Sequence, residues 1–145
     1  MKKLGFLVGK WAGEARLLRG PNQWVTVAQT EEVQYKLDGL ILIIEGVGRP
    51  ANDSAPILQA LGVISYDDAN RGYRMRAFND GRFLESEVEV LDGAKGMTWG
   101  FSFGEIKTST TLRITDEGDW TESAEIAFGS RPAQKLMELR VSRQK

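Results

Sequence analysis

Turn dipeptides recur at short intervals along this chain of 145 residues, and strand-like segments lie between them. In Asp38-Gly39, Asp80-Gly81 and Asp92-Gly93 the glycine readily takes the positive φ that tight hairpins need. Between the turns, β-branched and aromatic residues alternate with polar residues at a period of two. The pattern predicts about ten antiparallel strands in sequential order. Their expected starts are near Lys10, Gln23, Leu40, Ile57, Gly72, Arg82, Gly96, Ile106, Trp120 and Ala133.

The alternation also assigns side chains to two faces. With Asp80-Gly81 as a two-residue loop, Arg76 lies opposite Glu85 and Arg74 lies opposite Glu87, which makes a charged outer face. The interleaved side chains are mostly apolar and belong inside. A four-residue loop at 92–95 and a two-residue turn at 104–105 carry this register onward. The inner face then also holds Met97, Trp99, Phe101, Phe103, Ile106, Thr108, Thr110, Leu112 and Ile114.

Three consecutive hairpins agree on one inner face, which predicts an all-β, up-and-down meander that closes into a barrel. Closure is expected because it removes exposed strand edges. Residues 2–8 are expected to form a short helix that caps one end. The length suits a single domain over residues 1–145.

Composition excludes several classes of protein. The chain has no Cys and no His, which excludes disulfides, thiolate or imidazole catalysis, and histidine-bound zinc or haem. The formal charge of −1 does not suit a nucleic-acid binder. No apolar run reaches the roughly 18 residues of a membrane span. We expect no metal and no cofactor.

The N-terminal segment bears on localisation. Met1-Lys2-Lys3 and the apolar residues after it are reminiscent of a secretory leader, but the apolar stretch is short and no small-residue cleavage site follows. We therefore expect a cytoplasmic protein. The alternative is a secreted form from which a leader has been removed.

Gly9-Lys10-Trp11, directly behind the apolar stub Leu4 to Val8, stands where a barrel would begin. Further short motifs are Tyr66 to Tyr73, Trp120 to Glu125 and Met137 to Arg140. Together they resemble the calycin group of lipocalins, fatty-acid-binding proteins and nitrobindin-like domains, and especially the uncharacterised bacterial DUF1579-type families.

This resemblance implies a ten-stranded barrel with an internal cavity. It also implies that Gly9 lets the backbone turn, that Trp11 plugs one end, and that Arg140 or Arg143 packs over the Trp11 ring. The haem site of nitrobindin-like domains cannot be carried over, because they hold haem through a histidine that this chain lacks.

The predicted inner face carries polar groups among apolar ones, which is typical of a small-molecule site. The candidate ligand-binding residues on this face are Tyr35, Tyr66, Tyr73, Met75, Ser86, Val88, Trp99, Phe101, Thr108 and Thr110. We predict that the barrel binds a small, lipophilic molecule. The alternative is a filled core in which the hydroxyl groups bond to one another or to trapped water.

Glu122 is a further candidate ligand-binding residue. It alternates with Trp120 and Ala124, so it points inward if a three-residue loop around Gly118 brings its strand into phase. The alternative is an outward, solvated side chain, and Glu31 and Glu45 carry a similar ambiguity. An inward Glu122 beside a tyrosine would favour a rival function, an isomerase or hydrolase that acts on a lipophilic substrate.

The strand after Asp38-Gly39 suggests a second rival. Its register pairs Tyr35 with Leu42 inside, so Ile41 and Ile43 point outward. Two exposed isoleucines suit a homodimer contact, which would make the barrel an interaction module without a ligand. The alternative is that the N-terminal segment or Trp24 covers them.

Overall fold

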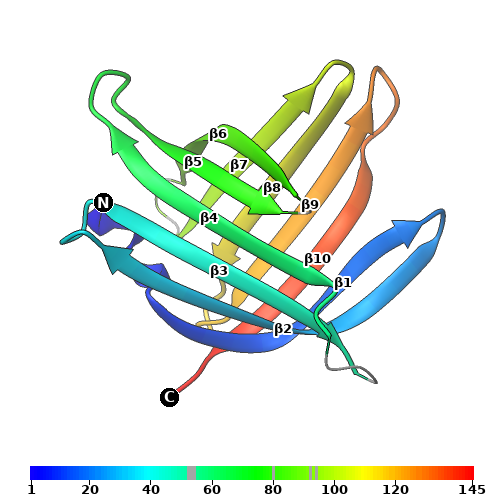
Figure 1. The fold of residues 1–145 in the computed structure, drawn as a ribbon, viewed down its shortest axis with the longest axis horizontal. Helices are drawn as coiled ribbons and strands as arrows, with labels where there is room; N and C mark the ends of the chain where they lie inside the picture. The colour runs from blue at the N-terminus through cyan, green and yellow to red at the C-terminus, as the bar shows by residue number, and fades with distance from the viewer. Residues whose placement is uncertain (52–54, 80, 92, 94) are drawn as a thin grey trace.

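The computed structural model describes residues 1–51, 55–79, 81–91, 93 and 95–145, and in this part of the chain ten antiparallel strands form a closed barrel. Each strand pairs with the next, and the last pairs with the first (Figure 1). A 3₁₀ helix, η1 (Lys2–Leu7), precedes them. The strands are β1 (Gly9–Gly20), β2 (Gln23–Lys36), β3 (Ile41–Pro50), β4 (Leu58–Asp67), β5 (Gly72–Asn79), β6 (Arg82–Val90), β7 (Gly96–Phe103), β8 (Ile106–Ile114), β9 (Trp120–Phe128) and β10 (Gln134–Arg143).

The predicted fold class and strand order are confirmed, and each strand begins within one residue of its expected start. Turn chemistry explains this agreement. Gly39, Gly81 and Gly93 have φ values of 87°, 70° and 69°, which glycine adopts without a steric penalty. Asp80 and Asp92, which precede two of these glycines, lie outside the described residues.

The assignment of faces from residue 73 to residue 114 is also confirmed. Arg76 pairs with Glu85 across β5 and β6, and the Arg76 Nε to Glu85 Oε1 distance is 3.3 Å on the exposed outer face. Val88 pairs with Trp99, and Trp99 pairs with Thr110, along the inner face. Because paired residues of antiparallel strands point to the same side, one row of side chains crosses the interior from β5 to β8.

Helix η1 and two tryptophans close one end of the barrel. The Trp11 and Trp120 rings meet edge to face, with centroids 5.4 Å apart. Trp11 Nε1 donates a hydrogen bond to the Leu7 carbonyl at 2.9 Å, and Leu4 and Leu7 are fully buried beneath. Buried aromatic pairs of this kind contribute more than their area alone.

Arg143 is the arginine that covers the Trp11 ring, with its Cζ 4.2 Å from the ring centroid. It pairs with Trp11 across β1 and β10 and also donates to the Phe6 carbonyl. The expected structural role of Arg140 is therefore wrong. Arg140 pairs with Glu14 on the outer face and binds Asp119 there at 2.9 Å.

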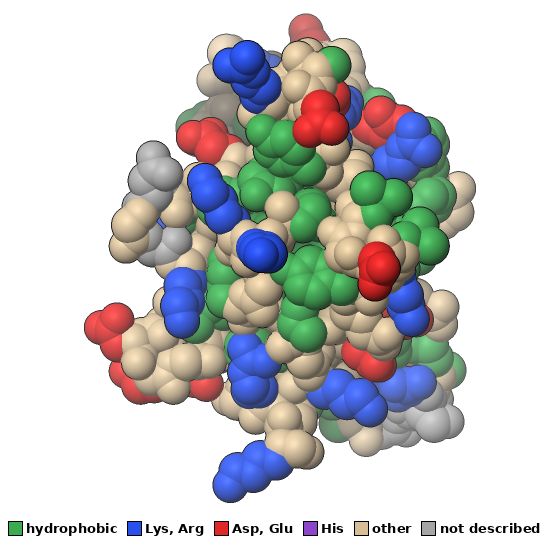
Figure 2. All heavy atoms as spheres, turned by 90° about the vertical axis from the view of Figure 1, so that its left-hand side faces the viewer, with side chains coloured by type: hydrophobic (Ala, Val, Ile, Leu, Met, Phe, Trp, Pro, Cys, Tyr) green, Lys and Arg blue, Asp and Glu red, His purple; other side chains and the backbone are tan. Residues whose placement is uncertain are grey.

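The outer surface mixes charges with hydrophobic groups. Figure 2 shows Lys and Arg side chains around a central hydrophobic area on one side of the barrel. Ile41 and Ile43 alternate with the buried Leu42 and are partly exposed, so they face outward. A homodimer through these two residues stays a prediction. No helix in the described ranges has the length and apolar character needed to cross a bilayer.

Replacing Trp11 by Ala should destabilise the barrel by about 3–5 kcal/mol, because it removes the floor of the closed end and leaves a cavity. Urea unfolding at equilibrium measures the difference. The matched control is Trp24→Ala, since Trp24 lies partly exposed on the outer face under Arg16. Trp24→Ala should lower the free energy of unfolding by about 1 kcal/mol or less. Equal losses in the two variants would contradict the assigned role of Trp11.

Candidate ligand site inside the barrel

Two polar side chains of β2 are buried in the barrel. Gln29 is 1% exposed and Glu31 is 7% exposed, and both point to the inner face together with Val27. The neighbouring strand β3 places glycines opposite them, Gly48 beside Gln29 and Gly46 beside Glu31. A Cβ at Gly46 would lie 2.5 Å from Glu31 Oε2, and one at Gly48 would lie 2.7 Å from Gln29 Oε1. The two glycines therefore leave the space that these side chains occupy.

The Gln29 amide is only half satisfied. Its Nε2 donates to Glu31 Oε2 at 2.6 Å, while its Oε1 has no hydrogen-bond partner among the described residues. A buried acceptor without a donor costs about 1–3 kcal/mol. Such a group marks a place where a bound donor would be stabilising.

Glu122 of β9 approaches from another wall of the barrel. It pairs with Leu112 and Leu139, both buried, so it shares their inward face. The expected three-residue loop is wrong: residues 115–119 connect Ile114 to Trp120. Three and five are both odd numbers, so the longer loop leaves Glu122 on the same face of the sheet as the shorter loop would. Glu122 Oε1 accepts a hydrogen bond from Trp120 Nε1 at 3.2 Å.

Burial changes the acidity of both carboxyl groups. It raises the pKa of Glu31 to about 8, with a further increase from the charge of Glu122 and a decrease from the Gln29 hydrogen bond. Burial raises the pKa of Glu122 to about 7, against the hydrogen bond from Trp120. Near neutral pH this pair can therefore exchange protons, accept donor groups or bind a cation.

Three of the six hydroxyl groups expected to orient a ligand form hydrogen bonds with the backbone. Tyr35 donates to the Met1 carbonyl at 2.9 Å. Ser86 donates to the Glu87 carbonyl and accepts from the Gly100 amide. Thr108 accepts from the amide of Phe101 at 3.2 Å.

The remaining predicted tyrosines lie toward the closed end. Tyr66 and Tyr73 pack edge to face, with ring centroids 5.2 Å apart, and Tyr66 is 42% exposed. Desolvation, followed by the neighbouring tyrosines, raises the pKa of Tyr73. Thr110 is buried, between Trp99 and Ala124. These three groups lie on the inner face that the sequence assigned to them.

The apolar part of the predicted site runs from the interior to the open end. Met75 and Val88 are buried, whereas Trp99 and Phe101 keep part of their surface accessible although they point inward. At the end opposite η1, one cross-strand row consists of Phe103, Ile106 and Phe128, which are 50%, 36% and 44% exposed. The inner face is therefore apolar from this exposed row to the buried Met75 and Val88.

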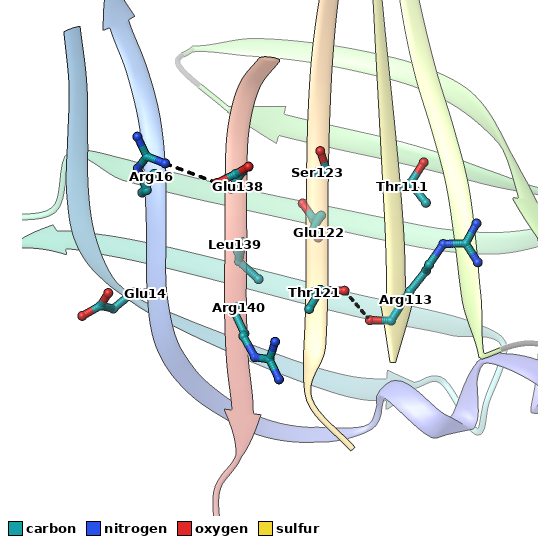
Figure 3. A pocket seen from close by; sticks show the side chains of 10 residues that line it. All are labelled: Glu14, Arg16, Thr111, Arg113, Thr121, Glu122, Ser123, Glu138, Leu139 and Arg140. Carbon is teal, nitrogen blue, oxygen red and sulfur yellow. Dashed lines mark hydrogen bonds and ion pairs between the residues drawn. The ribbon is translucent and has the colours of Figure 1, made fainter. Parts of the chain in front are cut away.

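A separate depression of about 460 Å³ lies on the outer face of the sheet. Figure 3 shows its charged wall, in which Arg16 Nη1 lies 3.4 Å from Glu138 Oε2. Its other lining residues are Glu14, Thr111, Arg113, Thr121, Glu122, Ser123, Leu139 and Arg140. Glu122 and Leu139 pair across β9 and β10, so this depression lies behind the inner site rather than in it.

Sequence reasoning missed Gln29 and left the direction of Glu31 open. A signal was present: polar residues interrupt the inward row Val27, Gln29, Glu31, Val33, and two glycines lie in register on the next strand. Period-two alternation alone does not reveal it, because a polar residue in an inner row also suggests a shifted register.

No family model and no curated protein matches the sequence. Among solved structures, Rv2717c from M. tuberculosis is similar, with a TM-score of 0.76 and 13% identity over 99% of this chain and 96% of that chain. The S-type phycobiliprotein lyase CpeS from Guillardia theta has a TM-score of 0.66 and 10% identity over 99% and 92%. Both fit a calycin-like barrel fold, while the DUF1579-type assignment stays a prediction.

Substituting Glu31 by Gln should make the stability of the barrel less dependent on pH. Folded Glu31 keeps its proton up to a pKa of about 8, whereas the unfolded chain loses it near the ordinary 4.5. The native state of the wild type is therefore destabilised as the pH rises between these two values. Glu31→Gln should gain several kcal/mol over the wild type by about pH 9, at about 1.4 kcal/mol per pK unit.

Urea unfolding at about pH 4, 7 and 9 measures this gain, which should vanish at the lowest pH. Glu125→Gln, at an exposed position of β9, is the matched control and should follow the wild type. A Glu31→Gln curve parallel to that of the wild type would contradict a buried carboxyl group.

Proposed function

We propose that this barrel binds a small, lipophilic molecule in its interior. The observation that carries the proposal is the inner face between the open end and Gln29. There, inward Trp99 and Phe101 remain partly accessible, and the buried Gln29 Oε1 has no hydrogen-bond donor among the described residues. A concave apolar surface with a few convergent polar groups is the usual form of a ligand site.

Each part of the inner face has a separate role in this proposal. Met75, Val88 and Trp99 would bury the apolar body of the ligand, which is worth about 25 cal/mol per Å² of apolar surface removed from water. Gln29, Glu31 and Glu122 would orient its polar end. The likeness to a phycobiliprotein lyase is one of fold alone, so these roles rest on the residues of this chain.

The two rival functions have less support. An isomerase or hydrolase would need a buried carboxyl group beside a tyrosine, but among the described residues Glu122 accepts its hydrogen bond from Trp120. An interaction module through Ile41 and Ile43 would not need Gln29 and Glu31 inside the barrel. Burying such groups is unfavourable unless they gain partners.

Filling the interior should weaken binding. Thr108 points inward between Phe101 and Ile126, and Thr108→Trp would place an indole where the ligand body is expected. We expect saturable binding of an apolar fluorescent dye to the wild type and an affinity at least about tenfold lower for this variant. Ser109→Trp, on the outer face of the same strand, is the control and should bind as the wild type does.

Native mass spectrometry of freshly purified protein complements the titration by identifying a co-purified molecule. Urea unfolding verifies that both variants fold. Equal dye affinity in Thr108→Trp and the wild type would place the dye elsewhere. Absence of saturable dye binding, together with no co-purified molecule, would reject the proposed function.

A further inference from the structure

We propose that the polar end of the ligand is a protonated amine, so that the barrel selects a lipophilic organic ammonium ion over an alcohol or a carboxylate of equal length. This inference rests on the proposed function. The acceptor cluster that would receive the ammonium group consists of Gln29, Glu31 and Glu122.

The first argument is that acceptors in this part of the barrel outnumber free donors. Trp11 Nε1 donates to the Leu7 carbonyl, and Trp120 Nε1 donates to Glu122. Gln29 Nε2 donates to Glu31. In the ionised form that a bound cation favours, each carboxyl group accepts hydrogen bonds and cannot donate them, so the cluster then offers a ligand mainly acceptors.

The second argument is the unpartnered Gln29 Oε1. This atom is buried and has no donor among the described residues. It is a neutral amide oxygen, so it signals a missing donor independently of the two acidic side chains. An ammonium group carries three N–H donors, enough to reach one amide oxygen and two carboxyl groups.

The third argument is charge. In the described ranges the buried polar or charged residues are Gln29, Glu31, Ser86 and Thr110, and no Lys or Arg is buried with them. Every ion pair found there joins exposed or partly exposed side chains, and none includes Glu31 or Glu122. Buried carboxylates are ordinarily paired with a cation, and a ligand cation would supply the charged partner that the described residues do not.

The surroundings of the cluster fit an apolar ligand body. On its own strand Glu31 is flanked on the inner face by Gln29 and Val33, and Leu139 lies beside Glu122. A carboxylate ligand would gain no ion pair from the glutamates and would be repelled by whichever of them is ionised. An alcohol could donate one hydrogen bond but would not favour their ionised forms.

Proton linkage gives the inference an additional readout. Because burial holds protons on both glutamates near neutral pH, a bound cation that favours their ionised forms must release protons. The groups that act on this pair are Glu31 and Glu122 themselves, with Gln29 and Trp120 as hydrogen-bond donors.

The test uses three probes with one chain length: octylammonium, octanol and octanoate. Isothermal titration calorimetry of the full chain at about pH 7, in two buffers of different ionisation enthalpy, gives affinities and the number of protons released. We expect octylammonium to bind at least about tenfold more tightly than octanol, octanoate to bind most weakly, and only octylammonium to release protons.

Glu31→Gln and Glu122→Gln keep the shape of the side chains and remove their charge. Each should weaken octylammonium binding about tenfold and leave octanol binding within about twofold. Glu125→Gln, on the outer face of β9, should change neither. If a glutamine variant does not fold, the head-group series on the wild type still decides the question.

The titrations distinguish failure of the ammonium inference from failure of the proposed function. If octanol or octanoate binds as tightly as octylammonium, the ammonium inference is overturned while the proposed function stands. If an ammonium preference survives in both glutamine variants, the cluster is not its source and the inference is also overturned. If none of the three probes binds, the proposed function fails and the inference fails with it.

Discussion

The pairing of β1 with β10 is the interaction on which the rest of the structure depends. Seven residue pairs, from Trp11–Arg143 to Leu17–Met137, join the two ends of the chain and turn a ten-stranded meander into a closed wall (Figure 1). Closure leaves neither of these strands as an edge. It also brings Trp11 to Trp120 and Arg143 to Trp11, so the closed end forms from both termini.

A closed wall also makes the interior a place where polar groups are costly. Gln29 and Glu31 are buried and Glu122 is half-buried, with no buried Lys or Arg among the described residues, and desolvation raises the pKa of both carboxyl groups toward the neutral range. A barrel built only for stability would place apolar residues at these positions. Polar residues at such positions are concentrated at functional sites, where they lower stability but permit binding.

Much of the architecture could be predicted because it depends on local rules. Glycine in the turns fixes the hairpin loops, and period-two alternation then fixes the faces, so Arg76 meets Glu85 and Val88 meets Trp99 as expected. The prediction was weaker where a loop length was uncertain, as before Trp120. It was wrong for Arg140, because the register between β1 and β10 is not set by a hairpin.

The sequence by itself determined the strand order, the inner and outer rows, and the absence of cysteine and histidine chemistry. Only the tertiary structure decided that the charge of Glu122 acts on Glu31, 91 positions away in the chain, and that Gln29 Oε1 has no donor in the described part of the chain. The physical reason is distance. Alternation and turn preference act between neighbours in sequence, whereas burial and electrostatic coupling depend on walls that meet only after the barrel has closed.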